Sequence, residues 1–467
     1  MYSYDLVFTG GTVVFPDKVQ QTDIAVDKGV IVHIGKLSCE DIESARQLVN
    51  AEGLYIMAGM IDAHVHLNEP GFGDWEGFVT GSAALAAGGC TTYMDMPLNG
   101  VPPTVTPAAL QQKRELAVGH SHIDYACWGG LVPGNLQELD ALSEQGVCGF
   151  KAFMSAPGDP SEEAFRNVDD LTLLEGMRHI ARMGRVLALH AESEPIVSAW
   201  TAALLAEGRT TAADYSASRP IQAELEAVRT ALEYGRQTGC SLHFVHISSA
   251  AAVRMIQDAR QEGMDVTLET CPHYLTLTDV DLEQIGPAAK CAPPLRSLDE
   301  QELLWQCVAA GDIDMITSDH SPCPTVLKTA AAADMFDAWG GISGAQHSLE
   351  LMISEGYKKR GLPLPLISRM LSQAPARRFG LYPQKGEIRI GADADLVLVD
   401  LNTAYTVQSE QLLYRHKHSP YVDREMGCQV SMTVVRGHIV YTREKGVHDH
   451  AVGKSLHIRN EKPLSLF

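Results

Sequence analysis

Two histidines with one residue between them follow an apolar stretch early in the chain. His64 and His66 belong to the sequence Gly-Met-Ile-Asp-Ala-His-Val-His-Leu-Asn-Glu-Pro-Gly, which spans residues 59–71. Residues two apart on a β-strand point to the same face, so both imidazoles are expected on one side where a buried strand ends. Imidazole is a common ligand of divalent metal ions, and the pair therefore predicts half of a metal site.

Spacing alone does not identify such a site, because the same His-x-His pattern recurs at 120–122, 416–418 and 448–450. A metal site needs three or more ligands that converge in space. The pair at 64 and 66 differs from the others, since it follows a hydrophobic run and precedes Pro70-Gly71, a turn signal.

Four further polar side chains stand where apolar runs stop: Lys151, His190, His246 and Asp319. Taken singly, a lysine in apolar surroundings usually extends to solvent, and a lone histidine more often forms hydrogen bonds in the core. Taken with the histidine pair, they place imidazoles, an amine and a carboxylate at the same end of several strands. This convergence predicts a metal centre at one end of a parallel sheet.

The middle of the chain alternates between apolar strand patterns and helical patterns, which is typical of a parallel sheet covered by helices. The pattern predicts helices over residues 171–182, 224–237, 250–261 and 299–309. It predicts strands over residues 56–65, 90–96, 123–128, 147–153, 186–190, 242–247, 265–269 and 313–317. This number of strands matches a (β/α)8 TIM-like barrel, whose chemistry lies at the C-terminal ends of the strands. A doubly wound open sheet is the alternative, because periodicity does not reveal whether a sheet closes.

Both ends of the chain read instead as short alternating strands separated by turn residues, from residue 4 to about 56 and again from 394 to 441. This texture predicts a small β-sandwich domain built from residues 1–56 and 385–467. The catalytic barrel domain would then occupy residues 57–384.

The composition is that of a globular protein with an acidic surface. The 467 residues are 45% hydrophobic, and 58 acidic against 37 basic side chains give a net charge of −21. Such a charge repels nucleic acid and anionic membranes, which favours a small-molecule substrate. Ten cysteines without a C-x-x-C pair favour reduced thiols in the cytoplasm, and no apolar run approaches the roughly 18 residues of a membrane span.

With these residues in place, the sequence resembles the cyclic amidohydrolases of the amidohydrolase superfamily, and among them the allantoinase family most closely. The resemblance covers essentially the whole chain. It rests on the Asp-x-His-x-His stretch at 62–66 and on the motifs Met-Pro-Leu-Asn at 96–99, Cys-Pro-His-Tyr at 271–274, Ser-Asp-His-Ser-Pro-Cys-Pro at 318–324, Trp-Gly-Gly-Ile at 339–342 and Gly-Glu-Ile-x-x-Gly-x-x-Ala-Asp-Leu at 386–396.

The resemblance implies a centre of two divalent metal ions held by the six residues singled out above. In that arrangement one ion lies on His64, His66 and Asp319, the other lies on His190 and His246, and Lys151 bridges both. The resemblance also implies that CO2 converts Lys151 to N6-carboxylysine. The ions are expected to be zinc, with cobalt, manganese or iron as alternatives, because nitrogen and oxygen ligands suit all of them. Asp319 is the expected catalytic residue, which takes a proton from the nucleophilic water and passes it to the departing amide nitrogen.

Departures from related families indicate the substrate. Dihydroorotases read His-x-His-x-Arg-Glu-Pro-Gly, and their arginine holds the substrate carboxylate, whereas this chain carries Asn68 at that position. Hydantoinases and dihydropyrimidinases tend to carry a tyrosine shortly after the bridging lysine, and residues 151–158 contain none. The resemblance therefore favours allantoin, a neutral hydantoin ring with a ureido arm, as the substrate and allantoate as the product. The expected substrate contacts are the side chains of Asn99 and Ser321 and backbone groups near Ala292 and Gly341.

Several alternatives stay open at this point. The alternatives are another cyclic amidase, hydantoinase-like or dihydroorotase-like, and a non-catalytic scaffold with the same fold. Asn99 beside Gly100 also suits a plain turn. The resemblance implies a homotetramer, with no nucleic acid or membrane partner. Residues 325–337 are expected to form a mobile helix or lid beside the site. His243 is left out of the site, and Cys323 is interpreted as a bystander.

Overall fold

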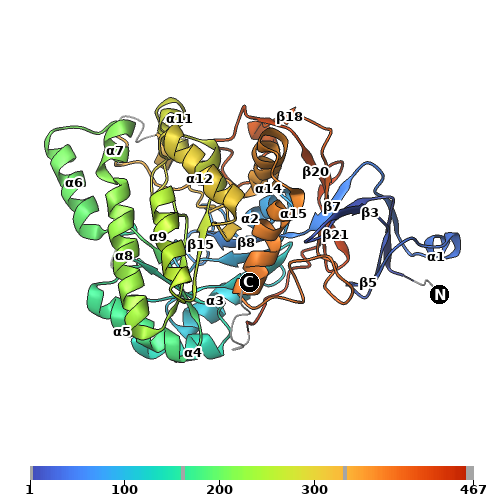
Figure 1. Cartoon of the computed structure of the whole chain (residues 1–467), viewed down its shortest axis with the longest axis horizontal. Helices are drawn as coiled ribbons and strands as arrows, with labels where there is room; N and C mark the ends of the chain where they lie inside the picture. Colours follow the sequence, from blue (N-terminus) through green and yellow to red (C-terminus); the bar gives the residue numbers. More distant parts are fainter. Residues whose placement is uncertain (1–3, 159–163, 330–333, 459–467) are drawn as a thin grey trace.

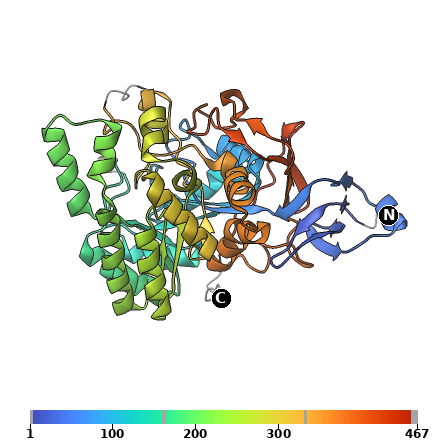
Figure 2. The ribbon, with the colours of Figure 1, turned by 45° about the horizontal axis from the view of Figure 1, so that its top comes forward.

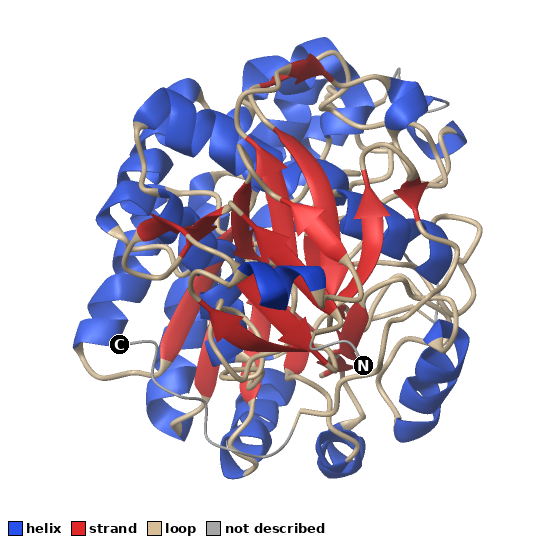
Figure 3. Cartoon of the chain, turned by 90° about the vertical axis from the view of Figure 1, so that its right-hand side faces the viewer, coloured by secondary structure: helices blue, strands red, loops and turns tan. Residues whose placement is uncertain are grey.

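The computed structural model describes residues 4–158, 164–329 and 334–458 of the chain. A barrel of parallel strands surrounded by helices occupies the left side of Figure 1, and the strands of the N-terminal segment lie at the right edge. Turned forward, the same two parts remain distinct (Figure 2). The view from the side of the N-terminus shows helices along the periphery and strands in the middle (Figure 3).

Backbone pairing closes the barrel. Adjacent pairing runs from β10 through β9 to β8, and from β11 through β12, β13, β14 and β15 to β16, with β10 and β11 forming one interrupted strand. The circle closes beyond β16, where Val65 pairs with His320 and the His66 N–H donates to the His320 carbonyl at 2.7 Å. The predicted barrel is therefore confirmed, and the open sheet is excluded. The barrel strands are β8 (Met60–Val65), β9 (Cys90–Asp95), β10 (Asp124–Cys127), β11 (Gly129–Gly130), β12 (Phe150–Phe153), β13 (Val186–His190), β14 (Ser241–Phe244), β15 (Val266–Thr270) and β16 (Met315–Ile316).

The predicted helices are present with ends shifted by no more than three residues, as α5 (Asp170–Arg182), α8 (Ile221–Thr238), α9 (Ala250–Gln261) and α12 (Leu298–Ala310). Their ends carry ordinary capping residues. Asp169 accepts the Thr172 N–H at 2.7 Å at the start of α5, and Gly239 ends α8 in the left-handed conformation. Each of these helices turns an apolar stripe toward the barrel.

Shorter helical elements fill the connections. The α-helices are α1 (Cys39–Glu43), α2 (Phe78–Ala87), α3 (Pro107–Ala117), α4 (Leu139–Glu144), α6 (Glu194–Ala206), α7 (Ala212–Ser218), α10 (Pro272–Thr276), α11 (Asp279–Ile285), α13 (Val326–Thr329), α14 (Ser348–Leu351), α15 (Leu364–Ser368) and α16 (Ala374–Arg378). The 3-10 turns are η1 (Leu136–Glu138), η2 (Gly286–Ala289), η3 (Ala345–His347) and η6 (Ser409–Gln411), and the π-helical stretches are η4 (Met352–Lys359) and η5 (Arg369–Gln373).

The β-sandwich packs a seven-stranded sheet on a four-stranded one. The larger sheet has the order β22-β21-β20-β17-β7-β2-β3 and so combines both ends of the chain, and the smaller has the order β5-β4-β1-β6. Phe8 and Val26 from the smaller sheet and Ile56 and Leu398 from the larger belong to one buried apolar cluster between them. The strands are β1 (Leu6–Thr9), β2 (Thr12–Val14), β3 (Val19–Gln21), β4 (Ile24–Asp27), β5 (Val30–Ile34), β6 (Leu48–Asn50), β7 (Tyr55–Ala58), β17 (Leu396–Asp400), β20 (Gln429–Val435), β21 (His438–Thr442) and β22 (Gly446–Val447), and a separate pair joins β18 (Tyr405–Thr406) to β19 (Glu425–Met426).

The prediction of one strand over residues 56–65 is wrong. The segment is two strands, with β7 in the sandwich sheet and β8 in the barrel. The chain changes sheets at Gly59, where an added Cβ would lie 2.2 Å from the Thr91 side chain. Both strands are buried, so the apolar pattern runs through the break and conceals it.

Residues near the C-terminus return to the barrel after leaving the sandwich. Ser455 pairs with Tyr125, and the Leu456 N–H donates to the Tyr125 carbonyl at 2.7 Å. The division into residues 1–56 with 385–467 and 57–384 stays a prediction, since segments on the sandwich side of that division also contact barrel strands. Within the described ranges, no helix is long and apolar enough to cross a membrane.

Candidate functional site

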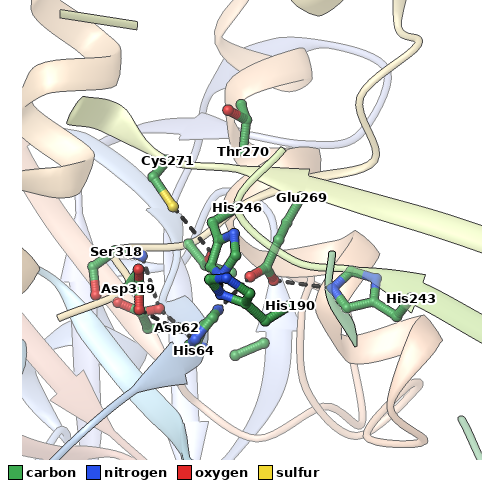
Figure 4. Close-up of polar contacts among 12 residues, drawn as sticks. Asp62, His64, His190, His243, His246, Glu269, Thr270, Cys271, Ser318 and Asp319 are labelled. Carbon is green, nitrogen blue, oxygen red and sulfur yellow. Dashed lines mark hydrogen bonds and ion pairs between the residues drawn. The ribbon is translucent and has the colours of Figure 1, made fainter. Parts of the chain in front are cut away.

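The barrel brings the histidine pair and Asp319 together at the C-terminal ends of its strands. His64 is the penultimate residue of β8, and its Nε2 lies 3.2 Å from Asp319 Oδ1. His66 Nε2 lies 3.3 Å from the same oxygen. One ligand atom from each residue lies within 4.8 Å of the others, a spacing at which one metal ion can be held. Figure 4 shows His64 and Asp319 pointing into a common space with His190 and His246.

His190 and His246 form the other side of this space. His190 ends β13, and its Nδ1 lies 2.9 Å from Nε2 of His246. The ring centroids of His246 and His64 are 5.5 Å apart, so the two halves of the predicted centre are adjacent. Nδ1 of His66 and Nδ1 of His246 are buried and have no hydrogen-bond partner among the described residues.

Lys151 enters the same space from β12. Its side chain is fully buried, and Nζ has no hydrogen-bond partner in the described part of the chain. The amine lies 5.1 Å from the centroid of the Phe153 ring. Burial lowers the pKa of Lys151 to about 8, because removing a cation from water is costly. A neutral amine is therefore accessible near neutral pH.

Burial also sets the charge of the neighbouring groups. It lowers the pKa of His190, and burial together with the adjacent His190 ring lowers the pKa of His246 well below its usual value. Both imidazoles are therefore neutral, which is the form that binds metal. Burial opposes ionisation of Asp319, but His64 and the hydrogen bond from His66 hold its pKa well below the usual range.

Glu269 orients His64 and was not identified from the sequence. Its Oε1 lies 2.6 Å from His64 Nδ1, and its Oε2 lies 3.0 Å from His243 Nε2 (Figure 4). Burial opposes ionisation, yet the two imidazoles lower the pKa of Glu269 to about 2. The ionised carboxylate fixes the His64 ring with Nε2 facing Asp319. His243, left out of the predicted site, supports this carboxylate from behind.

Glu192 does the same for His190. The fully buried carboxylate accepts a hydrogen bond from His190 Nε2 at 2.9 Å and an ion pair from Arg219. Nδ1 of His190 is thereby the nitrogen left to face His246. A signal for both carboxylates was present, since Glu269 is the last residue of a predicted strand and Glu192 follows His190 by two residues.

Two site residues have a positive φ, a backbone conformation that residues other than glycine rarely adopt. His246 has φ of 39° and Asp319 has φ of 46°. Such conformations persist when surrounding contacts hold them. Next to Asp319, the Ser318 N–H donates to Asp62 Oδ1 at 3.1 Å, and burial raises the pKa of Asp62 to about 7.

A cavity of about 510 Å³ opens above the six residues and is lined by all four predicted substrate contacts: Asn99, Ser321, Ala292 and Gly341. Asn99 Nδ2 donates to Ser321 Oγ at 3.2 Å, which ties the two side chains together. At Gly341, with φ of 145°, an added Cβ would lie 2.4 Å from the Ser321 carbonyl oxygen. No side chain larger than glycine's fits there without moving the wall.

Asn68 does not line this cavity. It is buried, and its Nδ2 donates to the Pro322 carbonyl at 3.0 Å, so the side chain supports the loop after Asp319. The predicted lid at 325–337 begins as α13, and its residues 330–333 lie outside the described part of the chain. Cys323 is buried, and burial raises the pKa of its thiol, which agrees with a bystander.

The model of the amidohydrolase family matches residues 55–440. An allantoinase of Rubrobacter xylanophilus is 48% identical over 94% of this chain and 95% of its own, and an allantoinase of Deinococcus radiodurans is 47% identical over 94% and 96%. The solved structure of an L-hydantoinase (dihydropyrimidinase) from Arthrobacter aurescens superposes with a TM-score of 0.93 and 35% identity, covering 97% of this chain and 99% of that one.

These matches extend over the barrel, the sandwich and the residues gathered at the strand ends. The chain belongs to the amidohydrolase family.

Proposed function

We propose that this protein is an allantoinase, which hydrolyses the hydantoin ring of allantoin to allantoate. The observation that carries the proposal is the convergence of His64, His66, Lys151 and Asp319 beneath a cavity whose wall includes the neutral polar side chains of Asn99 and Ser321. Allantoinases of several bacteria share 42–48% of the sequence over nearly its full length, which supports the same substrate. Allantoin is uncharged, and it suits contacts such as Asn99 and Ser321 better than an anionic ring would.

A pair of divalent cations fits the site, with His64, His66 and Asp319 for one and His190 and His246 for the other. Two features support this: the ligand atoms of the first group lie within 4.8 Å of one another, and the Lys151 amine is buried without a partner. Carboxylation of Lys151 would remove the cost of that burial and supply a bridging anion. When bound, such cations lower the pKa of water and polarise a carbonyl group, and zinc, cobalt, manganese and iron all suit the donor set.

The protein's own residues then do three things. Asp319 Oδ1, within reach of both His64 and His66, accepts the proton of the attacking water and returns it to the amide nitrogen as the ring opens. Glu269 and Glu192 keep the His64 and His190 rings in fixed orientations. The cavity walls hold the ring over these groups, which fixes the distance and orientation of the reacting atoms.

A hydantoinase is the second candidate, because the solved structures similar to this chain include an L-hydantoinase with a TM-score of 0.93. Its identity of 35% is lower than the 48% of the first allantoinase compared. A dihydroorotase is disfavoured, since Asn68 replaces the arginine expected for a carboxylate ligand and faces a backbone carbonyl instead. A non-catalytic scaffold would have no reason to keep all six residues together in the barrel mouth.

Turnover decides between these candidates. Purified protein supplied with zinc and bicarbonate should open allantoin to allantoate, with hydantoin a weaker substrate and dihydroorotate the weakest. Preference for hydantoin or dihydroorotate would overturn the assigned substrate and leave the metal centre in place. No turnover of any ring, with no stoichiometric metal by elemental analysis, would favour the scaffold.

We further propose a homotetramer. Helix α6 supports an association between copies, because Trp200 exposes 52% of its surface on a largely apolar helix. Light scattering after size exclusion should give four times the mass of 50.7 kDa. A monomer mass would contradict the proposal.

A further inference from the structure

One wall of the substrate cavity is a strip of chain from Phe336 to Gly341, and every residue of this strip lines the cavity. The strip contains neither helix nor strand. Ala338 and Gly341 are buried in it, and their backbone groups need partners outside regular secondary structure, because a buried backbone group without a partner is costly.

Two buried lysines supply most of those partners. Lys290 Nζ donates to the Phe336 carbonyl at 3.2 Å and to the Ala338 carbonyl at 2.5 Å. Lys328 Nζ donates to the carbonyls of Trp339 and Gly341, each at 2.7 Å. The two side chains expose only 5% and 4% of their surface. Both lysines therefore direct their donors at one short strip.

The backbone beside each lysine holds the same strip. The Gly341 N–H donates to the Lys290 carbonyl at 2.8 Å, and the Trp339 N–H donates to the Leu327 carbonyl at 3.2 Å. Gly341 thus has no free N–H for a substrate. The Gly341 carbonyl oxygen accepts a hydrogen bond from Lys328 Nζ with one lone pair. Its second lone pair can accept a hydrogen bond from a ring N–H of the substrate.

Holding two ammonium groups here has an energetic cost. Burial and mutual repulsion lower the pKa of Lys290 to about 7, and burial lowers the pKa of Lys328 to about 8. Arg219 adds further repulsion, while Asp334 and Asp337 offset it. Apolar side chains of this size would fill the space at lower cost, so the value of the lysines lies in their donors.

We propose that Lys290 and Lys328 are positioning residues for substrate binding, which hold the 336–341 strip in place and thereby set the position of Gly341 at the cavity. Lys290 also lines the cavity, whereas Lys328 does not. Within the described residues, the hydrogen bonds of both ammonium groups go to the strip and not to Asp319 or the histidines of the centre, so both lysines act on binding of the ring and leave the chemical step alone. The kinetic part of this inference rests on the proposed hydrolysis of a neutral cyclic ureide.

Substitution of the lysines separates an effect on substrate binding from an effect on the chemical step. Lys290→Met and Lys328→Met should each raise KM for allantoin about tenfold while kcat changes less than about twofold, since only binding is disturbed. The double variant should raise KM by less than the product of the single effects, because both side chains act on one strip. Lys358→Met is the matched control: its Nζ donates to the carbonyls of Leu401 and Gly427, away from the cavity, and KM should not change.

Hydrogen exchange gives a readout that needs no turnover. A peptide containing Trp339 and Gly341 should exchange faster in Lys290→Met and Lys328→Met than in the wild-type protein or in Lys358→Met, with melting temperatures close to the wild type. Unchanged exchange and unchanged KM would overturn the inference while allantoin turnover stands. If the wild-type protein opens no ring, the proposed function fails, and faster exchange in the two variants would still support the anchoring of the strip.

Discussion

Two buried lysines at opposite ends of the barrel differ in their contacts: one is paired with carboxylates and the other is not. Lys385 lies between the start of β10 and the sandwich, where Nζ contacts Asp124 at 2.8 Å, Asp393 at 3.1 Å and Asp395 at 2.6 Å. Lys151, at the C-terminal end, has no hydrogen-bond partner within the described residues. Burial lowers the pKa of Lys151 to about 8, whereas the carboxylates around Lys385 outweigh burial and raise its pKa above the usual value.

The contrast shows why a cluster of ligand types is not enough to identify a metal site. Asp124, Asp393 and Asp395 lie as close together as His64, His66 and Asp319, and either group could hold an ion by distance alone. At the aspartate cluster the chain itself supplies the cations, since Lys385 and Arg436 both pair with Asp124. A cluster whose carboxylates are paired with cations of the chain serves stability, whereas a cluster that leaves an amine and imidazole nitrogens unpaired suits metal binding.

Removing the unpaired lysine should have the largest effect on activity. Lys151→Ala should lose bound metal and reduce kcat/KM by about three orders of magnitude or more, because the bridging ligand is gone. Its melting temperature without metal should hold or rise, since a buried unpaired amine is removed. Partial rescue by a short carboxylic acid would support the carboxylated side chain. Full activity with normal metal content would contradict a role for Lys151 in holding metal, and with it the difference between the two lysines.

Asp319→Asn tests the carboxylate that faces both histidines. The amide keeps the shape of the side chain but cannot accept and return a proton, so kcat should fall by about two to four orders of magnitude. Metal content, measured on the same preparation, should stay substantial because the four histidines remain. A rate near that of the wild type would remove Asp319 from proton transfer.

Lys385→Ala tests the other end of the barrel. It leaves the buried carboxylates of Asp124 and Asp395 and the partly buried one of Asp393 facing one another, with the Arg436 guanidinium paired to Asp124, and should lower the free energy of unfolding by about 3–5 kcal/mol. Activity per folded molecule and metal content should match the wild type when measured well below the midpoint. Loss of metal without loss of stability would reverse the assignments of the two clusters.

The strand ends explain how much of this could be predicted. His64, His190 and Asp319 are visible because each follows an apolar run, and in a parallel barrel all such ends meet at one rim. The contacts of Lys290 are not visible, because its partners are backbone carbonyls of an irregular segment, and the pairing of Lys385 with Asp124 is not visible, because the two lie 261 residues apart. The break at Gly59 is hidden for a different reason, since both flanking strands are buried.

Orientation of the ligands should give the smallest effect. Glu269→Gln keeps a hydrogen-bonding side chain between His64 and His243 but removes its charge, so metal affinity should fall about 10–100-fold with the fold intact. Competition with a chelator measures this directly, and saturating metal should restore most of the turnover. Glu300→Gln is the control: its carboxylate also accepts a hydrogen bond, from the Ala250 N–H, but it touches none of the six residues. If Glu269→Gln bound metal as tightly as this control, the histidine rings would be held by packing alone, and the difference between the two ends of the barrel would rest on Lys151 by itself.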